Sequence, residues 1–495
     1  MSLRVLLILL PLLVSALILP LLKKQVVLVK VIFMSTILFV SAMTWMTILN
    51  GDTIANTSVV FSSWDVSIGI EFKFTWLSMV FGTFVMSLST LVASYALSDM
   101  KHHISEDKFA SYATLVLLML FAINGLTYTN DIFNMYVFME ILSITSAAII
   151  SIKHSKANYL ASFRYLMLNS IGSISILMAI AFLYMISGQL NMDALALALN
   201  QAYIDYPVVL TMAMVFMMVG FGIKAAMFPL HVWLPDAHST APTPSSALLS
   251  GIVVKVYIIL LIRLMHLVYR FAWFETFNLN TTLSIFALLG ILAGSLFAMG
   301  QKDIKRLLAY SSIAQIGYLF LGLSLGTSAG LSATLFHIMT HGVLKIGLFL
   351  SVGAFIYQTH QRKIADLQGI GWEMPLSLTV FGVSALGLIG IPGTMGFMSK
   401  FYISNALIRA DFAIALVVII LSSFLNAVYY MPIIINGFFK DNSSLAKDMK
   451  LDKIPLTMSV SLVSLLIINL AIGLYPNILK DVIDVAINTM MRGGL

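Results

Sequence analysis

Five ionisable side chains lie inside long apolar runs of the sequence. They are Glu140, Lys224, Lys255, Lys345 and Lys400. An ionisable group at membrane depth is costly, so such residues commonly mark proton or ion pathways. Burial lowers the pKa of a lysine and raises that of a glutamate, while pairing has the opposite effect on each. Making or breaking one pair therefore changes proton affinity strongly, and the pattern favours proton transfer with Glu140 and Lys224 as the candidate pair.

A static ion pair that pins two helices together is the alternative for Glu140 and Lys224. Structural ion pairs need equal numbers of acidic and basic residues, but these runs hold four lysines and one clear carboxylate. Lys255 lies in the middle of its run, which disfavours extension of its side chain to the membrane surface. The surplus of bases favours transport.

A histidine pair precedes one of the lysines at helical spacing. His337, His341 and Lys345 are four residues apart, so they share one face of a helix. Histidine titrates near neutrality, which suits a proton relay. A metal pair or a packing role is the alternative, but no H-E-x-x-H motif is present and we expect no metal.

Two apolar runs are interrupted close to a lysine. Pro229 follows Lys224 by five residues, and Pro392 with Gly393 precedes Lys400. Proline removes a backbone donor and breaks a helix, and discontinuous helices in corresponding halves of a transporter point to an ion path. An ordinary proline kink is the alternative for each break taken alone. We expect two discontinuous helices beside the buried lysines.

The polar segment 231–246 follows the first interruption and contains His231, Asp236 and His238. It could form a wetted access to Lys224 or couple movements there. A plain connecting loop is the alternative, and the sequence does not decide between them.

The elements that position these side chains are transmembrane helices. Hydrophobic residues make up 60% of the chain, charged residues 10%, and the mean hydropathy is +0.98, far above the usage of soluble domains. Apolar runs of 18 residues or more are long enough to cross the bilayer as helices, and they are continuous, unlike the alternating segments of a barrel. We expect an all-α polytopic membrane protein with about 14 spans: 3–22, 26–49, 74–98, 110–128, 131–152, 159–187, 207–230, 243–269, 281–300, 306–325, 328–357, 375–408, 411–438 and 455–479.

Loop charges predict the orientation of these spans. Of the 28 Lys and Arg residues, seventeen fall in loops on one side, seven on the other, and four inside runs. The seventeen include Lys305, Lys440, Lys447, Lys450 and Lys453, and the seven include Arg263 and Arg270. The positive-inside rule then places the N-terminus outside. The net charge of +7 is explained by these loops, and no nucleic-acid patch is indicated. The first run lacks a signal-peptide cleavage site, so it is interpreted as a span.

Cofactor motifs are absent from the sequence. The chain has no cysteine, which excludes disulfides and thiolate metal ligands. We find no phosphate loop, nucleotide motif or catalytic triad pattern, so we expect no cofactor and no enzymatic energy source in this chain.

The stretch 224–244, KAAMFPLHVWLPDAHSTAPTP, followed by SSALLSG, resembles a family motif. Across residues 70–440 the sequence is similar to the antiporter-like membrane subunits shared by Mrp-type sodium/proton antiporters and respiratory complex I. The resemblance implies fourteen core helices, two inverted five-helix repeats, a glutamate–lysine pair, a lysine on the eighth helix and a charged residue after the break in the twelfth. Glu140, Lys224, Lys255 and Lys400 fall on those positions. The length of the chain and the lysine in the twelfth helix favour the D-type subunits of Mrp antiporters.

The resemblance implies a division of the chain into four segments. These are an N-terminal three-helix segment (1–109), two five-helix repeats (110–269 and 281–438), and a C-terminal helix with a tail (439–495).

The function that we predict is proton translocation in a multisubunit Na⁺/proton antiporter of the bacterial plasma membrane. Its partners would be other antiporter subunits, protons, Na⁺ and the lipid bilayer. A proton-pumping subunit of complex I or of a membrane-bound hydrogenase is the main alternative. A scaffold without transport and a transporter for organic solutes are two further alternatives.

Overall fold

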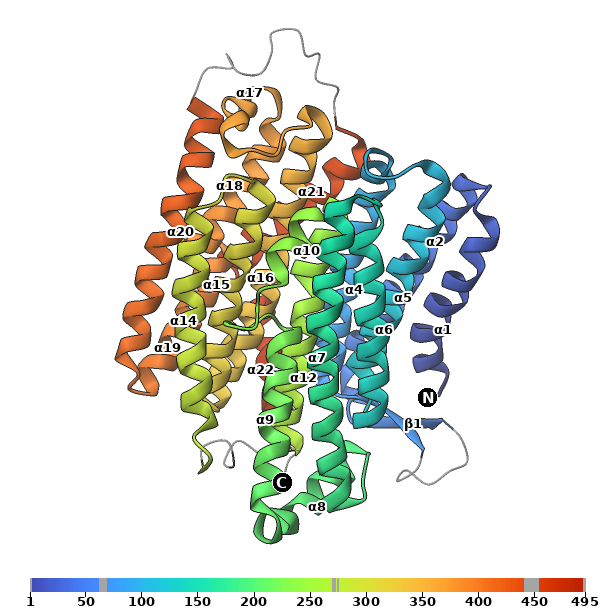
Figure 1. Ribbon diagram of the computed structural model, residues 1–495, viewed down its shortest axis with the longest axis vertical. Helices are drawn as coiled ribbons and strands as arrows, with labels where there is room; N and C mark the ends of the chain where they lie inside the picture. The colour runs from blue at the N-terminus through green and yellow to red at the C-terminus, as the bar shows by residue number, and fades with distance from the viewer. Residues whose placement is uncertain (1, 62–68, 269–272, 274–275, 440–453, 493–495) are drawn as a thin grey trace.

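The computed structural model describes residues 2–61, 69–268, 273, 276–439 and 454–492, and it is an elongated helical bundle (Figure 1). Arg270, Lys440, Lys447, Lys450 and Lys453, which were counted as loop charges, lie outside the described residues.

Thirteen helical segments in the described part of the chain are long and apolar enough to cross a membrane. Twelve run close to the predicted limits: α1 (Ser2–Ile18, extended by the 3₁₀ turn Leu19–Leu22), α2 (Val26–Leu49), α4 (Trp76–Asp99), α5 (Phe109–Tyr128), α6 (Ile132–Ser151), α7 (Lys156–Ser187), α9 (Pro207–Lys224), α14 (Leu279–Met299), α15 (Ile304–Ser324), α16 (Ser328–Thr359), α20 (Ala413–Phe439) and α21 (Leu456–Leu474). The remaining span is composite and consists of α11 (Thr243–Leu248), the π-helix Leu249–Val253, α12 (Val254–Arg263) and the π-helix Leu264–Val268.

A fourteenth span is made of two shorter helices, α18 (Pro375–Ile389) and α19 (Met395–Arg409). The other predicted break is also present, because α9 ends at Lys224 and the chain becomes helical again in α10 (Leu234–Thr240). The prediction of about 14 spans with two discontinuous helices is confirmed. The first repeat consists of the five spans that begin with α5, and the second consists of the five that begin with α14. Because five is an odd number, the second repeat starts at the end of the bundle opposite to the first.

Three structured regions at one end of the bundle were not predicted. A hairpin pairs β1 (Thr57–Phe61) with β2 (Ile70–Phe74) in antiparallel register. Helix α8 (Met192–Asp205) precedes α9, and α22 (Asn477–Arg492) follows α21. These regions lie at the lower end of Figure 1 with the N-terminus, the end that the loop charges assign to the outside. Shorter helical turns complete the described chain: α3 (Gly51–Ile54), α17 (Ile370–Glu373), and 3₁₀ turns at Met100–His102, Glu106–Lys108 and Ile364–Leu367.

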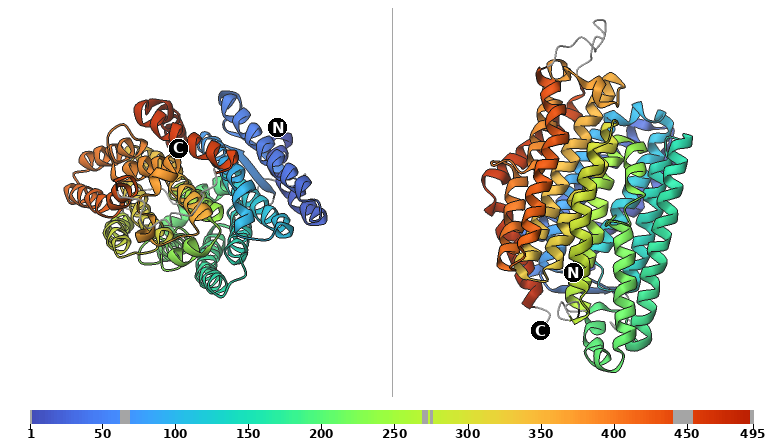
Figure 2. Two further views of the ribbon diagram at one scale, coloured as in Figure 1. Left: turned by 90° about the horizontal axis from the view of Figure 1, so that it is seen from above. Right: turned by 60° about the vertical axis from the view of Figure 1, so that its left-hand side comes forward.

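The core of the bundle is formed by three spans. In the apolar 18-residue stretch of each span, all residues are buried in α16 and in the span 243–266, and 94% are buried in α15. In α1, α2, α20 and α21 only 28–33% of them are buried. Seen from above, α1 and α2 lie at one end of the molecule and the orange helices of the second repeat at the other (Figure 2). Large apolar side chains such as Leu17, Val27, Ile420 and Phe424 remain exposed on the outer helices, as expected for a surface that faces lipid.

Candidate functional site: a buried line of lysines

Four lysines predicted to be buried are buried. Lys224, Lys255 and Lys345 are 0% exposed and Lys400 is 7% exposed. They lie on α9, α12, α16 and α19, so both repeats contribute. Each ammonium group donates to a hydroxyl or carbonyl oxygen.

Glu140 and Lys224 form an ion pair with a separation of 3.6 Å between Oε1 and Nζ. Lys224 also donates to the Ser143 hydroxyl at 2.8 Å, and Ser173 on α7 donates to the Glu140 carboxylate. The lysine is fully buried, whereas the glutamate side chain is 33% exposed. The pair therefore joins a lysine inside the bundle to a carboxylate with access to its surroundings.

The break after Lys224 places this lysine at the C-terminal end of a helix. There the last carbonyls have no intrahelical partner and favour a positive charge. The Trp233 indole donates to the Ile223 carbonyl at 2.9 Å and closes the break. The predicted interruption of this span near Pro229 is thus confirmed, and α9 ends at Lys224.

The second break lies before Lys400, which belongs to α19 and extends its ammonium group back to the end of α18. Gly390 and Gly393 have positive φ angles of 98° and 86°, which glycine adopts without strain. Lys400 donates to the Ile389 carbonyl at 3.1 Å, at the end of α18, and to Ser423 on α20 at 2.8 Å. In both repeats a buried lysine therefore lies at the carbonyl end of an interrupted helix.

Lys255 follows a π-helical turn and lies beside α16. Its ammonium group donates to the carbonyl of Ser250, within that turn. The backbones of the π-turn and of α16 approach each other closely: a Cβ atom added to Gly342 would lie 3.0 Å from the carbonyl oxygen of Gly251. π-Turns often occur at functional sites, and this one brings the lysine of the first repeat to the helix that carries Lys345.

Two adjacent serines of α15 link these lysines. The hydroxyls of Ser250 and Ser312 are 3.0 Å apart, and Lys345 donates to the Ser311 hydroxyl and, at 2.9 Å, to the Leu308 carbonyl. Sequence reasoning missed this pair, and the only available signal was two hydroxyls inside a strongly apolar run.

The two predicted relay histidines continue the line towards Lys400. The rings of His337 and His341 are nearly parallel, with centroids 6.0 Å apart. His337 Nδ1 is 2.7 Å from the hydroxyl of Ser399, the residue before Lys400. His341 interacts electrostatically with Lys255 and Lys345.

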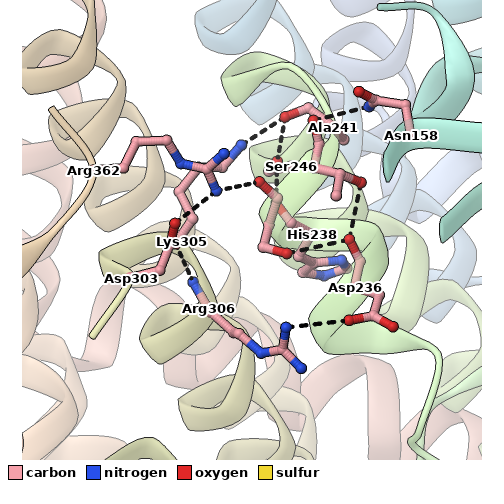
Figure 3. A network of polar contacts seen from close by, with 11 residues as sticks. Asn158, Asp236, His238, Ala241, Ser246, Asp303, Lys305, Arg306 and Arg362 are labelled. Carbon is pink, nitrogen blue, oxygen red and sulfur yellow. Dashed lines mark hydrogen bonds and ion pairs between the residues drawn. The ribbon is translucent and has the colours of Figure 1, made fainter. Parts of the chain in front are cut away.

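His238 lies inside the bundle, whereas the Asp236 side chain is 19% exposed (both are drawn in Figure 3). His238 is 0% exposed and interacts electrostatically with Lys255, Lys305 and Lys345. Both ring nitrogens of His238, like those of His341, lack a hydrogen-bond partner among the described residues.

Asp236 is paired with arginines from both repeats. It lies 2.5 Å from Arg164 of α7 and 3.4 Å from Arg306 of α15. His231 stacks on Phe228, with ring centroids 5.3 Å apart. Within the described part of the chain, these contacts join neither Asp236 nor His231 to Lys224.

Lys305 was counted as a loop charge, and the structure corrects that prediction. It is 2% exposed, and its ammonium group donates to the Ala241 carbonyl at 2.6 Å (Figure 3). Arg263, also assigned to a loop, is 4% exposed and donates to the carbonyls of Leu126, Thr127 and Thr129 at the end of α5. Both residues lie near a helix end in sequence, so only the tertiary fold shows that they are buried.

The surface next to Lys305 holds further titratable groups. His103 Nε2 lies 2.9 Å from the carboxylate of Asp99, which is 1% exposed. Burial lowers the pKa of His103 although the Asp99 carboxylate opposes this shift. Burial, and then repulsion from Arg362, lowers the pKa of Lys153 to about 8. The lowered pKa brings Lys153 closer to neutral pH than an ordinary lysine.

The arrangement consists of groups that can take up and release protons. Ammonium, imidazole and hydroxyl groups lie inside the bundle in both repeats, and groups of these kinds can exchange protons directly or through bound water. Within the described residues, no group of three or more His, Asp or Glu side chains could hold a metal ion.

Comparison with known proteins identifies the family. The family model described as NADH:quinone oxidoreductase/Mrp antiporter, TM matches residues 129–426, more than half of the chain. The chain belongs to this family. This range contains the buried line from Glu140 to Lys400.

Relatives from both branches of the family are similar to this member. NADH-quinone oxidoreductase subunit N of Desulforudis audaxviator is 38% identical over 67% of the chain, and the match spans 65% of that relative's length. The putative antiporter subunit mnhD2 of Staphylococcus aureus is 28% identical over 94% of the chain and 92% of its own length. This near full-length match supports the resemblance to D-type antiporter subunits.

Solved structures show the same fold. A chain of the membrane-bound sulfane sulfur reductase, an archaeal respiratory membrane complex, superposes with a TM-score of 0.89 at 29% identity, covering 99% of this family member and 98% of that chain. A chain of the Mrp complex from Dietzia sp. DQ12-45-1b superposes with a TM-score of 0.88 at 23% identity, covering 100% and 98%. Both neighbours are chains of membrane complexes, and this family member has the same fold.

Proposed function

We propose that this chain is the proton-translocating subunit of a multisubunit monovalent cation/proton antiporter, with Na⁺ as the exchanged cation. The observation that supports this most directly is that four lysines on four spans, two in each repeat, are buried. A scaffold would gain nothing from desolvating four lysines, because each one costs free energy inside the bundle.

The proposed cycle starts at the ion pair of Glu140 and Lys224. When the two side chains separate, Lys224 loses the attraction that favours its charged form, and it releases a proton into the line. The proton moves to Lys255 and then, through His341 and Lys345, to Lys400. Because neighbouring lysines repel one another, an added charge at one position pushes the next proton onward.

The inner end of this path would be the cluster around the buried side chain of Lys305. Lys305 interacts electrostatically with Asp99, Lys153 and His238, so it stands between titratable groups at that surface and the histidine next to Lys255. Asp236 and Arg306 hold the short helix α10 in place there. We assign this end to the cytoplasm, because the loops there carry most of the basic residues, and the N-terminus then faces outward in a bacterial plasma membrane.

A second candidate is a proton-pumping membrane subunit of a redox-driven complex. The 38% identity to NADH-quinone oxidoreductase subunit N supports it. The same lysines would then respond to electron transfer in partner subunits instead of to a cation gradient. The near full-length match to an antiporter subunit favours the first candidate.

The test uses everted membrane vesicles that contain the whole complex with this chain. We expect Na⁺ addition to dissipate an imposed proton gradient, read with a pH-sensitive dye. Lys224→Ala should abolish that response while the complex still assembles. A complex that copurifies with iron–sulfur proteins, and that moves protons only with an electron donor, would support the second candidate. Full Na⁺/proton exchange by Lys224→Ala would refute the proposed cycle.

A further inference from the structure

A polar pocket of about 260 Å³ opens at the end of the bundle that we assign to the outside. It is lined by the start of α16, the end of α19 and one face of α22. A pocket of this size holds several water molecules, because each occupies about 30 Å³. The proposed cycle uses none of the residues that line it.

The pocket contains one carboxylate and several donors. Asp484 of α22 accepts a hydrogen bond from Ser332 of α16 and pairs with Lys480 one turn earlier. Tyr402 and Arg409 of α19 are the other titratable groups in the lining. The Lys480 ammonium lies 5.5 Å from the centroid of the Tyr402 ring. Asp484 and Lys480 are thus held at the junction of three helices.

The two helices above the pocket lead directly into the buried line. Ser332 precedes His337 on α16 by five residues, and Tyr402 follows Lys400 on α19 by two. Five residues of helix span about 7.5 Å. His337 is itself joined to Ser399 at 2.7 Å. The pocket lining therefore begins two residues from Lys400 on α19 and five residues from His337 on α16.

We propose that Asp484 is the outer proton acceptor of this chain and that its pocket is the outward half of the route. This inference rests on the proposed function. A proton leaves the nitrogen of Lys400 or His337, passes through water and the Ser332 hydroxyl, and forms an O–H bond on the Asp484 carboxylate. The carboxylate then releases it to the outer solution, while Lys480 holds the empty carboxylate in position.

Asp481 provides a matched control. It lies on α22 three residues before Asp484, is exposed, and does not line the pocket. Asp484→Asn and Asp481→Asn remove the same charge from the same helix. We expect Asp484→Asn to lower the rate of Na⁺-driven proton movement at least tenfold and Asp481→Asn to change it less than twofold.

Asp484→Glu separates a proton-transfer role from a packing role. It keeps the carboxylate but changes its reach, so it should recover most of the activity if proton transfer is what matters. Assembly of each variant is checked by the elution of the complex in size-exclusion chromatography. Equal activity of Asp484→Asn and Asp481→Asn, in a preparation where Lys224→Ala is inactive, would overturn the inference and leave the proposed function standing. Loss of Na⁺-driven exchange in the unmodified complex would overturn both.

Accessibility gives a readout independent of transport. The chain has no cysteine, so a single introduced thiol is labelled without background. Asn405→Cys lies in the pocket lining and should react with a membrane-impermeant maleimide only from the outer side. Gln361→Cys, an exposed position after α16 at the opposite end, should react only from the inner side. An Asn405→Cys thiol that is unreactive from outside would overturn the assignment of the pocket as an outward route.

Discussion

The ion pair between Glu140 and Lys224 allows a quantitative prediction for Glu140→Gln, which removes the charge and keeps the shape. Two unit charges 3.6 Å apart attract by about 1 kcal/mol at the dielectric of water and by about 5 kcal/mol at an effective dielectric of ~20. The glutamate is one-third exposed and the lysine is fully buried, so a value of about 2–3 kcal/mol is appropriate. That energy changes the ratio of charged to neutral lysine by roughly 30- to 150-fold.

We therefore expect Glu140→Gln to slow Na⁺-driven proton movement in everted vesicles by at least about 30-fold. Glu140→Asp keeps the charge at a longer distance and should retain an intermediate rate. Both variants should assemble, because the Ser173 hydroxyl can still donate to the side chain at position 140. A Glu140→Gln complex with more than half of the normal rate would refute the reasoning, since the pair would then be a static contact.

Three other positions give predictions of different kinds. Gly342→Ala should lower the melting temperature of the purified complex by several degrees, because its Cβ atom would lie 2.6 Å from Phe84. Lys305→Met should slow proton movement about tenfold or more, since it removes the only ammonium group that we place between the inner surface and His238. The pKa of Lys153 in the folded chain is lowered to about 8. Between about pH 8 and 10 the folded state therefore binds fewer protons than the unfolded state, and stability rises with pH. Lys153→Met should weaken that rise, measured as the melting temperature at several pH values.

Each of these three predictions has a control. Gly382→Ala places its Cβ atom 3.8 Å from the nearest side chain, an ordinary contact, and should melt normally; equal melting of both glycine variants would contradict the packing argument. Lys302→Met removes an exposed charge three residues before Lys305, and an equal slowing by both would show a surface effect. An unchanged pH dependence in Lys153→Met would show that another group causes the rise.

The sequence was sufficient to predict the spans and the four buried lysines, because apolar runs of membrane length report helices directly. It was also sufficient for the two breaks, since proline and glycine interrupt a helix wherever it packs. It did not reveal β1, α8 or α22, because these elements are short or amphipathic and their apolar faces become recognisable only against the bundle.

The buried state of Lys305 could not be read from the sequence for a different reason. It follows Lys302 and precedes Arg306, so it looks like part of a solvated loop. It is buried only because α10, about 65 residues earlier in the chain, folds over it and offers a carbonyl. Ser311 and Ser312 were missed likewise, since a hydroxyl in an apolar run is as common in packing as in proton transfer. The roles of all these residues in transport remain predictions.

Asp236 has one consequence for how the two repeats communicate. Its carboxylate is shared by Arg164 of α7 and Arg306 of α15, so a relative shift of the repeats at this end must lengthen at least one of the two contacts. The same short helix carries His238, two residues further on. In the function proposed above, a partner protein that docks on this surface and displaces either arginine would shift α10 and with it the buried imidazole of His238.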